Sequence, residues 1–400
     1  MADEIGAESE RRSLSRRAVI AGGAVAAAGV VGGGVILSVR DRGVTAAPAE
    51  PAVTTAPIGS TVPATSAPTA PIRPTDISLP IGEFDSIDGI PPFTTPIEDH
   101  FLADSSGEPG PVIDADTYSL RIGGPFARNP ITLSYDDLLA REQVTRQVCL
   151  VSAWNTVGED WLSNVVWTGV PLSVLLDEAG IEDPTDPEIQ VFSTGADGLT
   201  GGFRAPLAYD GRTAMVALFM NGEPLPAVHG FPARLVVAGE YLFEAGTKWL
   251  ESIELTEFFG VDGFWIPRGW AKEAPVKTSS RIATHTSGAE FAAGPQTIGG
   301  VAWAPLQGIE RVEVSIEDAN EVRSRQSFDP TSWREAEIGS VESDETWVQW
   351  RYDWEASPGE WVIRVRATDK SGFTQRAEVV AARPDGSEGF HTIVVRIEPS

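Results

Sequence analysis

In the segment 76–286, apolar and polar residues follow patterns that are typical of β-strands. The run TYSLRIGG (117–124) alternates residue by residue, which is typical of a strand with one buried face. ARLVVAGE (233–240) is apolar over consecutive positions and predicts a fully buried strand. TKWLESIELTEF (247–258) predicts a further strand or strand pair. This part of the chain is therefore expected to contain sheet structure.

Short helices are predicted between these strands. In ITLSYDDLLARE, Ser134 and Asp137 have the spacing of a capping box, in which two side chains satisfy backbone N–H groups at the start of a helix. In VPLSVLLDEAGI, Pro171 suits the first turn of a second helix and Gly180 its C-terminal stop. Strands and helices together predict an α+β domain over residues 76–286.

The pattern changes near residue 287. IERVEVSIED, TWVQWRYDWEA, EWVIRVRATDK and HTIVVRIEP are all strand-like and are separated by turn residues. Within the first of them, Val312, Val314 and Ile316 alternate with polar residues. Strands at this spacing without helices predict an immunoglobulin-like β-sandwich over residues 287–400.

The first 42 residues are interpreted as a targeting segment. Two pairs of arginines, Arg11–Arg12 and Arg16–Arg17, precede an uncharged run rich in Ala and Gly, residues 18–39. This arrangement resembles a twin-arginine export signal, and the run also has the roughly 20 residues that a single membrane anchor needs. Whether it is cleaved or retained, it predicts an extracytoplasmic body. The Ala/Pro/Thr-rich stretch 43–75 predicts a semi-extended linker.

Composition narrows the classes of partner. The formal net charge is −27 and the isoelectric point is near 4.5, so the chain repels nucleic acid and anionic lipid surfaces. The apolar content of 42%, with 12 Trp and 16 Phe, is ample for the cores of two or three domains. A single cysteine, Cys149, excludes an internal disulfide framework.

Several longer motifs occur together in one order. NVVWTGVPLSVLLDEAGI, MNGEPLPAVHGFPARLVVAGEY, TKWLESIEL and GFWIPRGWAKEAPVKTSSRI resemble segments of the sulfite oxidase family of molybdenum-cofactor enzymes. GVAWAPLQGIERVEVSIEDAN and TWVQWRYDWEASPGEWVIRVRATDKSG resemble the sandwich domain through which that family dimerises. The resemblance covers about residues 93–397. It implies an oxidoreductase that transfers an oxygen atom to or from a small molecule and forms a homodimer.

In the second domain, the run TWVQWRYDW is the candidate surface for that dimer. Val348, Trp350, Tyr352 and Trp354 share one face of the expected strand, with Trp347 on the opposite face. These aromatic side chains form either an exposed association surface or the core of the domain itself.

The resemblance also implies a cofactor and its contacts. In this family molybdenum is bound by the dithiolene sulfurs of a molybdopterin and by one cysteine thiolate. HGFPARLVV and TKWL match the segments that hold the pterin phosphate, which implies His229, Arg234 and Lys248 as cofactor contacts. Asn155 matches the asparagine of the family's ligand motif. The sequence has no C-x-x-C-H haem motif, so a separate electron-transfer partner is expected.

Two residues compete for the metal-ligand position. The family motif reads Cys-Ala-Gly-Asn or Cys-Val-Ser-Asn, and a gapless alignment backward from Asn164 places it on SAWN, with Ser152 as the ligand. The exported bacterial methionine-sulfoxide reductases of the same superfamily carry Cys-x-x-Ala-Trp. A bulge in CLVSAW would then make Cys149 the ligand. Three positions apart, the two side chains point to opposite faces of a strand.

The pocket differs from that of the sulfite-oxidising enzymes at several positions. Thr156 and Val157 stand where arginines are usual, Leu199 replaces an aromatic residue, and Glu159 replaces a glycine. Bulky residues in YLFEAGTK replace a Gly- and Ser-rich stretch. A sulfite dianion needs cationic contacts, so a substrate other than sulfite is expected. Two classes remain open: a molybdopterin-dependent oxidoreductase, and a non-catalytic, cofactor-free member that acts in binding or assembly.

Overall fold

The computed structural model describes residues 77–103, 110–325 and 329–399. The predicted targeting segment (1–42) and linker (43–75) lie outside the described residues. Within the described ranges, no helix has the length and apolar character needed to cross a membrane.

The first sheet of the N-terminal half has five strands in the order β2-β1-β10-β5-β6. Their bounds are β1 (Ser119–Gly123), β2 (Ile131–Ser134), β5 (Ile189–Gly195), β6 (Thr200–Arg204) and β10 (Leu250–Glu257). β1 runs parallel to β10, and the other pairs are antiparallel. The alternating run at 117–124 and the run at 247–258 thus become neighbouring strands.

The second sheet of this half has the order β3-β4-β7-β8, and β9 also pairs with β7. Its strands are β3 (Val144–Val151), β4 (Leu162–Pro171), β7 (Ala214–Met220), β8 (Glu223–Pro224) and β9 (Arg234–Val237). β7 and β9 are buried at every position. Burial on both faces explains why their sequences are continuous apolar runs rather than alternating ones.

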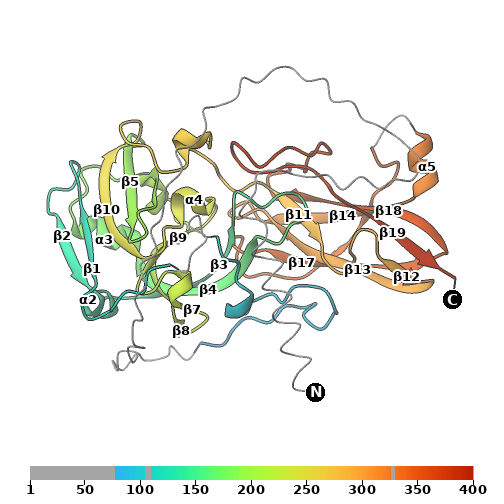
Figure 1. The fold of residues 1–400 in the computed structure, drawn as a ribbon, viewed down its shortest axis with the longest axis horizontal. Helices are drawn as coiled ribbons and strands as arrows, with labels where there is room; N and C mark the ends of the chain where they lie inside the picture. Colours follow the sequence, from blue (N-terminus) through green and yellow to red (C-terminus); the bar gives the residue numbers. More distant parts are fainter. Residues whose placement is uncertain (1–76, 104–109, 326–328, 400) are drawn as a thin grey trace, which may run out of the picture. The chain divides into compact units, whose positions relative to one another are not determined.

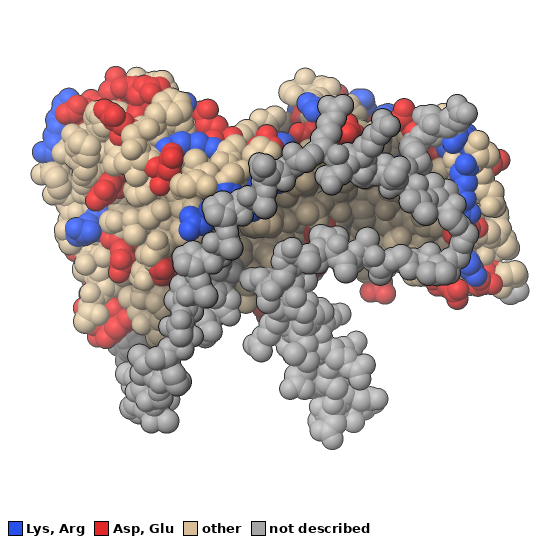
Figure 2. All heavy atoms as spheres, turned by 45° about the horizontal axis from the view of Figure 1, so that its top comes forward, with Lys and Arg blue, Asp and Glu red and all other residues tan. Residues whose placement is uncertain are grey.

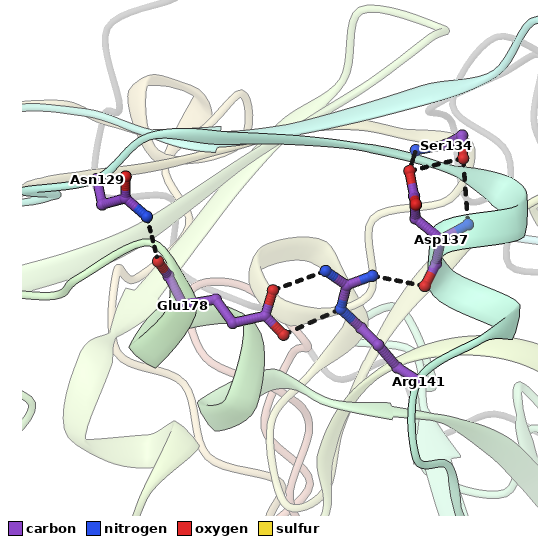
Figure 3. Close-up of polar contacts among 5 residues, drawn as sticks. All are labelled: Asn129, Ser134, Asp137, Arg141 and Glu178. Carbon is purple, nitrogen blue, oxygen red and sulfur yellow. Dashed lines mark hydrogen bonds and ion pairs between the residues drawn. The ribbon is translucent and has the colours of Figure 1, made fainter.

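Two short helices follow strands of this half, as the capping signals predict. Ser134 caps α2 (Tyr135–Leu139), and the reciprocal hydrogen bonds with Asp137 complete the capping box (Figure 3). Arg141 then binds both carboxylate oxygens of Glu178, at the end of α3 (Leu172–Glu178), over 3.0 and 2.7 Å (Figure 3). This ion pair ties the two helices together.

The C-terminal half consists of two sheets with the orders β11-β13-β17-β16 and β12-β19-β18-β14-β15 (Figure 1). The strands are β11 (Ser279–Ile282), β12 (Glu290–Ala292), β13 (Gly294–Trp303), β14 (Ile309–Asp318), β15 (Arg334–Glu335), β16 (Glu337–Ile338), β17 (Val348–Ala356), β18 (Gly359–Asp369) and β19 (His391–Glu398). One apolar core contains residues from both sheets, which makes this half a two-sheet β-sandwich. The four strand-like runs of the sequence correspond to β14, β17, β18 and β19. β11 lies before residue 287, the predicted start of the second domain, and still pairs with β13 of the sandwich.

The aromatic run of β17 does not form an exposed association surface. Val348 and Trp350 are fully buried in the sandwich core, and Tyr352 and Trp354 pack against the same core. The association-surface interpretation of this face is therefore wrong, because these side chains supply the apolar area that holds the two sheets together. Trp347, on the opposite face, packs into a different cluster.

That other cluster joins the two halves of the described chain, which lie in one compact unit. It contains Cys149 from β3, together with Trp303 and Trp347 from the sandwich. Beside it, the carboxylate of Glu345 accepts hydrogen bonds from the backbone N–H and hydroxyl of Thr213, at 2.6 and 2.5 Å. The backbone N–H of Cys149 donates to the Glu345 carbonyl at 2.8 Å. Apolar packing and paired polar groups thus fix the two halves to each other.

Acidic side chains are spread over the surface, with lysines and arginines between them, on the face shown in Figure 2. The excess of Asp and Glu in the sequence therefore does not gather into a single acidic patch on this face. Dispersed charge of this kind acts mainly on solubility.

Candidate cofactor site

Basic side chains converge where the 3-10 helix η3, strand β9 of the second sheet and the segment before β10 of the first sheet meet. His229 ends the 3-10 helix η3 (Ala227–His229), Arg234 opens β9, and Lys248 lies just before β10. Gly230 lies between them with φ of 109°, and a Cβ atom there would come within 3.1 Å of the Cβ atoms of both Arg234 and Lys248. Only glycine fits this close approach. The structure thus brings together the three side chains that the resemblance implies as cofactor contacts.

Arg234 is buried, with 2% of its surface exposed. Its guanidinium donates to the carbonyl of His229 at 3.2 Å and, at 3.5 Å, to those of Leu235 and Gly246. It also lies 5.0 Å from the ring of Trp167. No carboxylate of the described residues pairs with it. Burial lowers the pKa of Arg234 to about 10, so the protein holds this charge at a cost in solvation.

His100, which sequence reasoning missed, belongs to the same group. Its ring packs edge-on against that of His229, with 4.7 Å between the centroids, and its Nδ1 is buried with no partner among the described groups. Burial lowers the pKa of His100 well below its usual value, and His229, Arg234 and Lys248 lower it further. The sequence signal was weak, because His100 lies far from the recognised motifs and matches none of them.

The electrostatics of this basic group favour an anion. Burial first, and then the charges of Arg234 and Lys248, lower the pKa of His229 to about 4. Each positive charge therefore makes protonation of its neighbours harder. A bound phosphate would relieve that repulsion and accept hydrogen bonds from several of these donors.

The side chains of Lys248 and Trp249 hold the backbone of η3 by hydrogen bonds to its carbonyl groups. The Lys248 ammonium donates to the Val228 carbonyl at 3.1 Å, and the Trp249 indole N–H donates to the Ala227 carbonyl at 2.7 Å. Trp249 is fully buried and has a positive φ of 50°, which is unusual for a residue other than glycine. Such backbone strain persists where the surroundings over-determine it, and it is common at functional sites.

The predicted ligand motif forms a tight loop between β3 and β4. The Ser152 N–H donates to the Trp161 carbonyl at 3.0 Å, and the Ser152 hydroxyl accepts from the Trp154 N–H at 3.2 Å. The side-chain oxygen of Asn155 accepts from the Trp161 N–H at 2.9 Å. Asn155 therefore closes the loop internally. Its predicted role as a cofactor contact stays a prediction.

Cys149 lies within β3, whereas Ser152 directly follows the strand, so the predicted opposite orientation of the two side chains stays a prediction. Cys149 lies in the apolar cluster with Val151 and Trp347, and burial raises the pKa of its thiol far above its usual range. Val148 and Leu150, which have the same parity as Ser152, lie in the cluster of Trp167, the ring beside Arg234. Cys149 therefore lies on the face of β3 opposite to that of Val148 and Leu150, away from the cluster of Trp167.

The substituted positions of the pocket differ in burial. Glu159 and Thr156 are exposed, and Leu199 is half-buried. Glu244, in α4 (Leu242–Ala245), is buried, and its carboxylate accepts from the Gly202 N–H at 2.8 Å. Burial raises the pKa of Glu244 to about 8. Burial therefore disfavours a negative charge on Glu244.

An aromatic cluster lies beside the loop. The exposed ring of Trp154 packs edge-on against Trp270 and Trp265, at centroid distances of 4.9 and 6.1 Å. Arg383, from the sandwich, lies 5.6 Å from the rings of Trp154 and Trp270. Arg383 was also missed from the sequence, because it is remote from the loop along the chain. In the described part of the chain, no group of three or more His, Cys, Asp or Glu side chains has the geometry of a metal site.

Comparison with known proteins agrees with this geometry. Residues 107–265 match the family model of the oxidoreductase molybdopterin binding domain. The mitochondrial sulfite oxidase of Mus musculus is 29% identical over 345 residues, covering 73% of this chain and 60% of that protein. The NADH nitrate reductase of Solanum lycopersicum is 30% identical over 189 residues, covering 41% of this chain and 20% of that protein.

A solved structure shares the fold. The sulfane dehydrogenase SoxCD from Paracoccus pantotrophus superposes with a TM-score of 0.62 at 23% identity, covering 77% of this chain and 84% of that chain. The matched family model indicates the class, that of proteins with an oxidoreductase molybdopterin binding domain, and the solved structure shows the fold. The chain belongs to the sulfite oxidase family. It spans about a fifth of the nitrate reductases and three fifths of the mouse sulfite oxidase.

The residues present fit the phosphate end of a molybdopterin. The Nδ1 atom of His100 and the indole N–H of Trp167 are buried without a hydrogen-bond partner among the described groups, and Arg234 has no carboxylate partner there. Unsatisfied donors beside a buried cation are costly unless an anion or polar ligand occupies the site. At the metal end, the gapless alignment places the hydroxyl of Ser152 where the family carries a thiol, which is a poorer fit, and the alternative alignment places the thiol of Cys149 there.

Proposed function

We propose that the protein is an exported, molybdopterin-dependent oxidoreductase that transfers an oxygen atom to or from a small substrate other than sulfite. The observation that carries this proposal is the convergence of His229, Arg234 and Lys248 around Gly230. Family membership supports the same class of chemistry.

In this proposal the basic group holds the pterin phosphate. Arg234 is fixed by backbone carbonyls, so its guanidinium is pre-organised for an oxyanion. Lys248 and His229 add donors from η3 and the start of β10. When bound, the cofactor supplies a metal that cycles between two oxidation states and exchanges an oxygen atom with the substrate.

Ser152 is the better candidate for the metal ligand, with Cys149 as the alternative. Cys149 lies in an apolar cluster that disfavours its thiolate, whereas Ser152 lies beyond the end of β3, in the loop to β4. A hydroxyl has a far higher pKa than a thiol, so the metal itself must drive its deprotonation. Weak molybdenum loading is therefore expected in the natural protein.

The proposed substrate is small and is not sulfite. Thr156 and Val157 supply no charge in the loop. The cations found beside it are Arg383, near two indole rings, and Arg281, which donates to the Gly158 carbonyl. A dianion is expected to need more positive charge than this. An aromatic surface at Trp154 suits a less charged organic molecule.

A second candidate function is a non-catalytic member that uses the fold for binding or assembly. The observation that favours it is the hydroxyl of Ser152 at the ligand position, already bonded to the Trp154 N–H. Bulky Leu242 and buried Glu244 before Lys248 are consistent with a narrowed cavity.

Further parts of the proposal concern organisation. The sandwich is of immunoglobulin type and forms a homodimer, through a surface other than the buried aromatic face of β17. Electrons pass to a separate protein partner. The N-terminal segment exports the chain by the twin-arginine route or anchors it to the membrane.

The metal content of three proteins tests the ligand assignment. The natural chain and the variants Ser152→Cys and Cys149→Ala are produced in a host that makes molybdopterin, and molybdenum is measured by mass spectrometry. Ser152→Cys is expected to raise the molybdenum content about tenfold or more, because a thiolate binds the metal without a high-pKa deprotonation. Cys149→Ala is expected to change nothing. If Cys149→Ala abolishes loading of a natural protein that contains molybdenum, Cys149 is the ligand and the assignment of Ser152 is wrong.

A further inference from the structure

The loop that carries Ser152 is not held by its own domain alone. Its internal hydrogen bonds join Ser152 to Trp161, Trp161 to Asn155, and the Asn155 N–H to the Ser152 carbonyl at 2.9 Å. These bonds close the two ends of the loop. A further internal bond joins the Glu159 N–H to the Thr156 carbonyl at 3.0 Å, and the carbonyl groups of Asn155 and Gly158 are left to other partners.

The sandwich supplies those partners. The hydroxyl of Ser387 donates to the carbonyl of Asn155 at 2.6 Å, across 232 positions of sequence. The Nε–H of Arg281, in β11, donates to the carbonyl of Gly158 at 3.1 Å. Both donors come from the second half of the chain, and both act on the loop that contains the candidate ligand.

Close packing at Gly158 also holds the loop against the sandwich. Gly158 has φ of 92°, and a Cβ atom there would lie 2.6 Å from the ring of His391. That ring is held in turn by β11, because its Nδ1 accepts from the Ile282 N–H at 3.0 Å. Gly158 therefore packs directly against the His391 ring of the sandwich, and there is no room for a side chain at this position of the loop.

We propose that Ser387 and Arg281 are positioning residues, through which the sandwich sets the conformation of the loop Ser152–Trp161. The second domain then completes the candidate metal site of the first. This inference deepens the proposed function and rests on it only for the identity of the ligand at Ser152.

Amide hydrogen exchange of the full-length protein tests the positioning directly. The variants are Ser387→Ala and Arg281→Met, and the control is Ser371→Ala, whose hydroxyl bonds to Asp369 within its own turn. We expect exchange in the peptide 152–161 to become about tenfold faster in the first two variants, because loop opening no longer breaks an interdomain hydrogen bond. The control is expected to leave that peptide unchanged.

A conservative variant separates positioning from general destabilisation. Ser387→Thr keeps the hydroxyl and is expected to restore slow exchange. In the Ser152→Cys background, Ser387→Ala is expected to lower molybdenum content about threefold or more at unchanged pterin content, and Ser387→Thr is expected to recover it. Unchanged exchange in 152–161 in both Ser387→Ala and Arg281→Met would overturn the inference. The exchange result does not need a bound cofactor, so it also decides the inference if the proposed function fails.

Discussion

Glu244 offers a quantitative test of the environment just before Lys248. Its carboxylate is 5% exposed, one oxygen accepts from the Gly202 N–H, and the other is buried without a partner among the described groups. A Cβ atom at Gly263 would lie 2.8 Å from the carboxylate, so little space remains for water. Burial raises the pKa of Glu244 from 4.5 to about 8. At about 1.36 kcal/mol per pH unit, the ionised form costs up to about 5 kcal/mol.

The direction in which stability changes with pH follows from the difference between the folded and unfolded pKa of Glu244. Because the folded pKa lies above the unfolded one, this contribution to stability is fully present below pH 4.5 and is lost as the pH rises to about 8. Glu244→Gln keeps the shape and the acceptor for Gly202 but cannot ionise. At low pH, the free energy of unfolding of the variant is therefore expected to equal that of the natural protein or to be lower. At pH 9 it is expected to be higher than that of the natural protein by a few kcal/mol.

The assay is urea unfolding between pH 4.5 and 9, with exposed Glu159→Gln as the control. The natural protein and the control are expected to lose free energy of unfolding over this range. Glu244→Gln is expected to lose several kcal/mol less. If all three proteins follow the same pH profile, Glu244 is not a buried neutral carboxyl and the reasoning is refuted.

Other predictions concern the basic group, the loop and a helix cap. Arg234→Met is expected to raise the pKa of His229 from about 4, measured by NMR titration, because it removes one of the charges that oppose protonation; no change would contradict the electrostatic account. Gly158→Ala is expected to cost about 1–3 kcal/mol more in thermal unfolding than Gly211→Ala, which has a similar φ and open space around it; equal costs would mean that the loop is not tightly packed. Ser134→Ala is expected to cost about 1 kcal/mol, and a loss near zero would show that the capping box is dispensable.

Local patterns in the sequence predicted the elements but not their partners. The capping box at Ser134 and the alternating runs of β14 and β18 depend only on neighbouring residues, so the sequence was sufficient for them. The orientation of β17 was not predictable in this way. Alternation shows that Trp350 and Trp354 share a face, but only the pairing of the sheets shows that this face is inside.

The residues of the candidate site also fall into those that the sequence identifies and those that only the structure reveals. His229, Arg234 and Lys248 could be identified because they lie within motifs of the family. His100 and Arg383 could not be identified, since their proximity to the site depends on contacts between distant segments. Only the structure shows the neighbours of β3: Cys149 packs in the cluster of Trp347, and the opposite face packs in the cluster of Trp167. The choice between Ser152 and Cys149 stays a prediction.

The central claim is that the basic group binds the phosphate of a molybdopterin. The most direct measurement is the pterin content of the chain purified from a host that makes the cofactor, determined by oxidative release and fluorescence. The account predicts about one pterin per natural chain and at least a tenfold loss in Arg234→Met, because the buried guanidinium is the fixed donor to the phosphate. The control Arg311→Met, at a surface position of the sandwich, is expected to keep its pterin. Absence of pterin from the natural chain, or equal content in Arg234→Met, would contradict the claim.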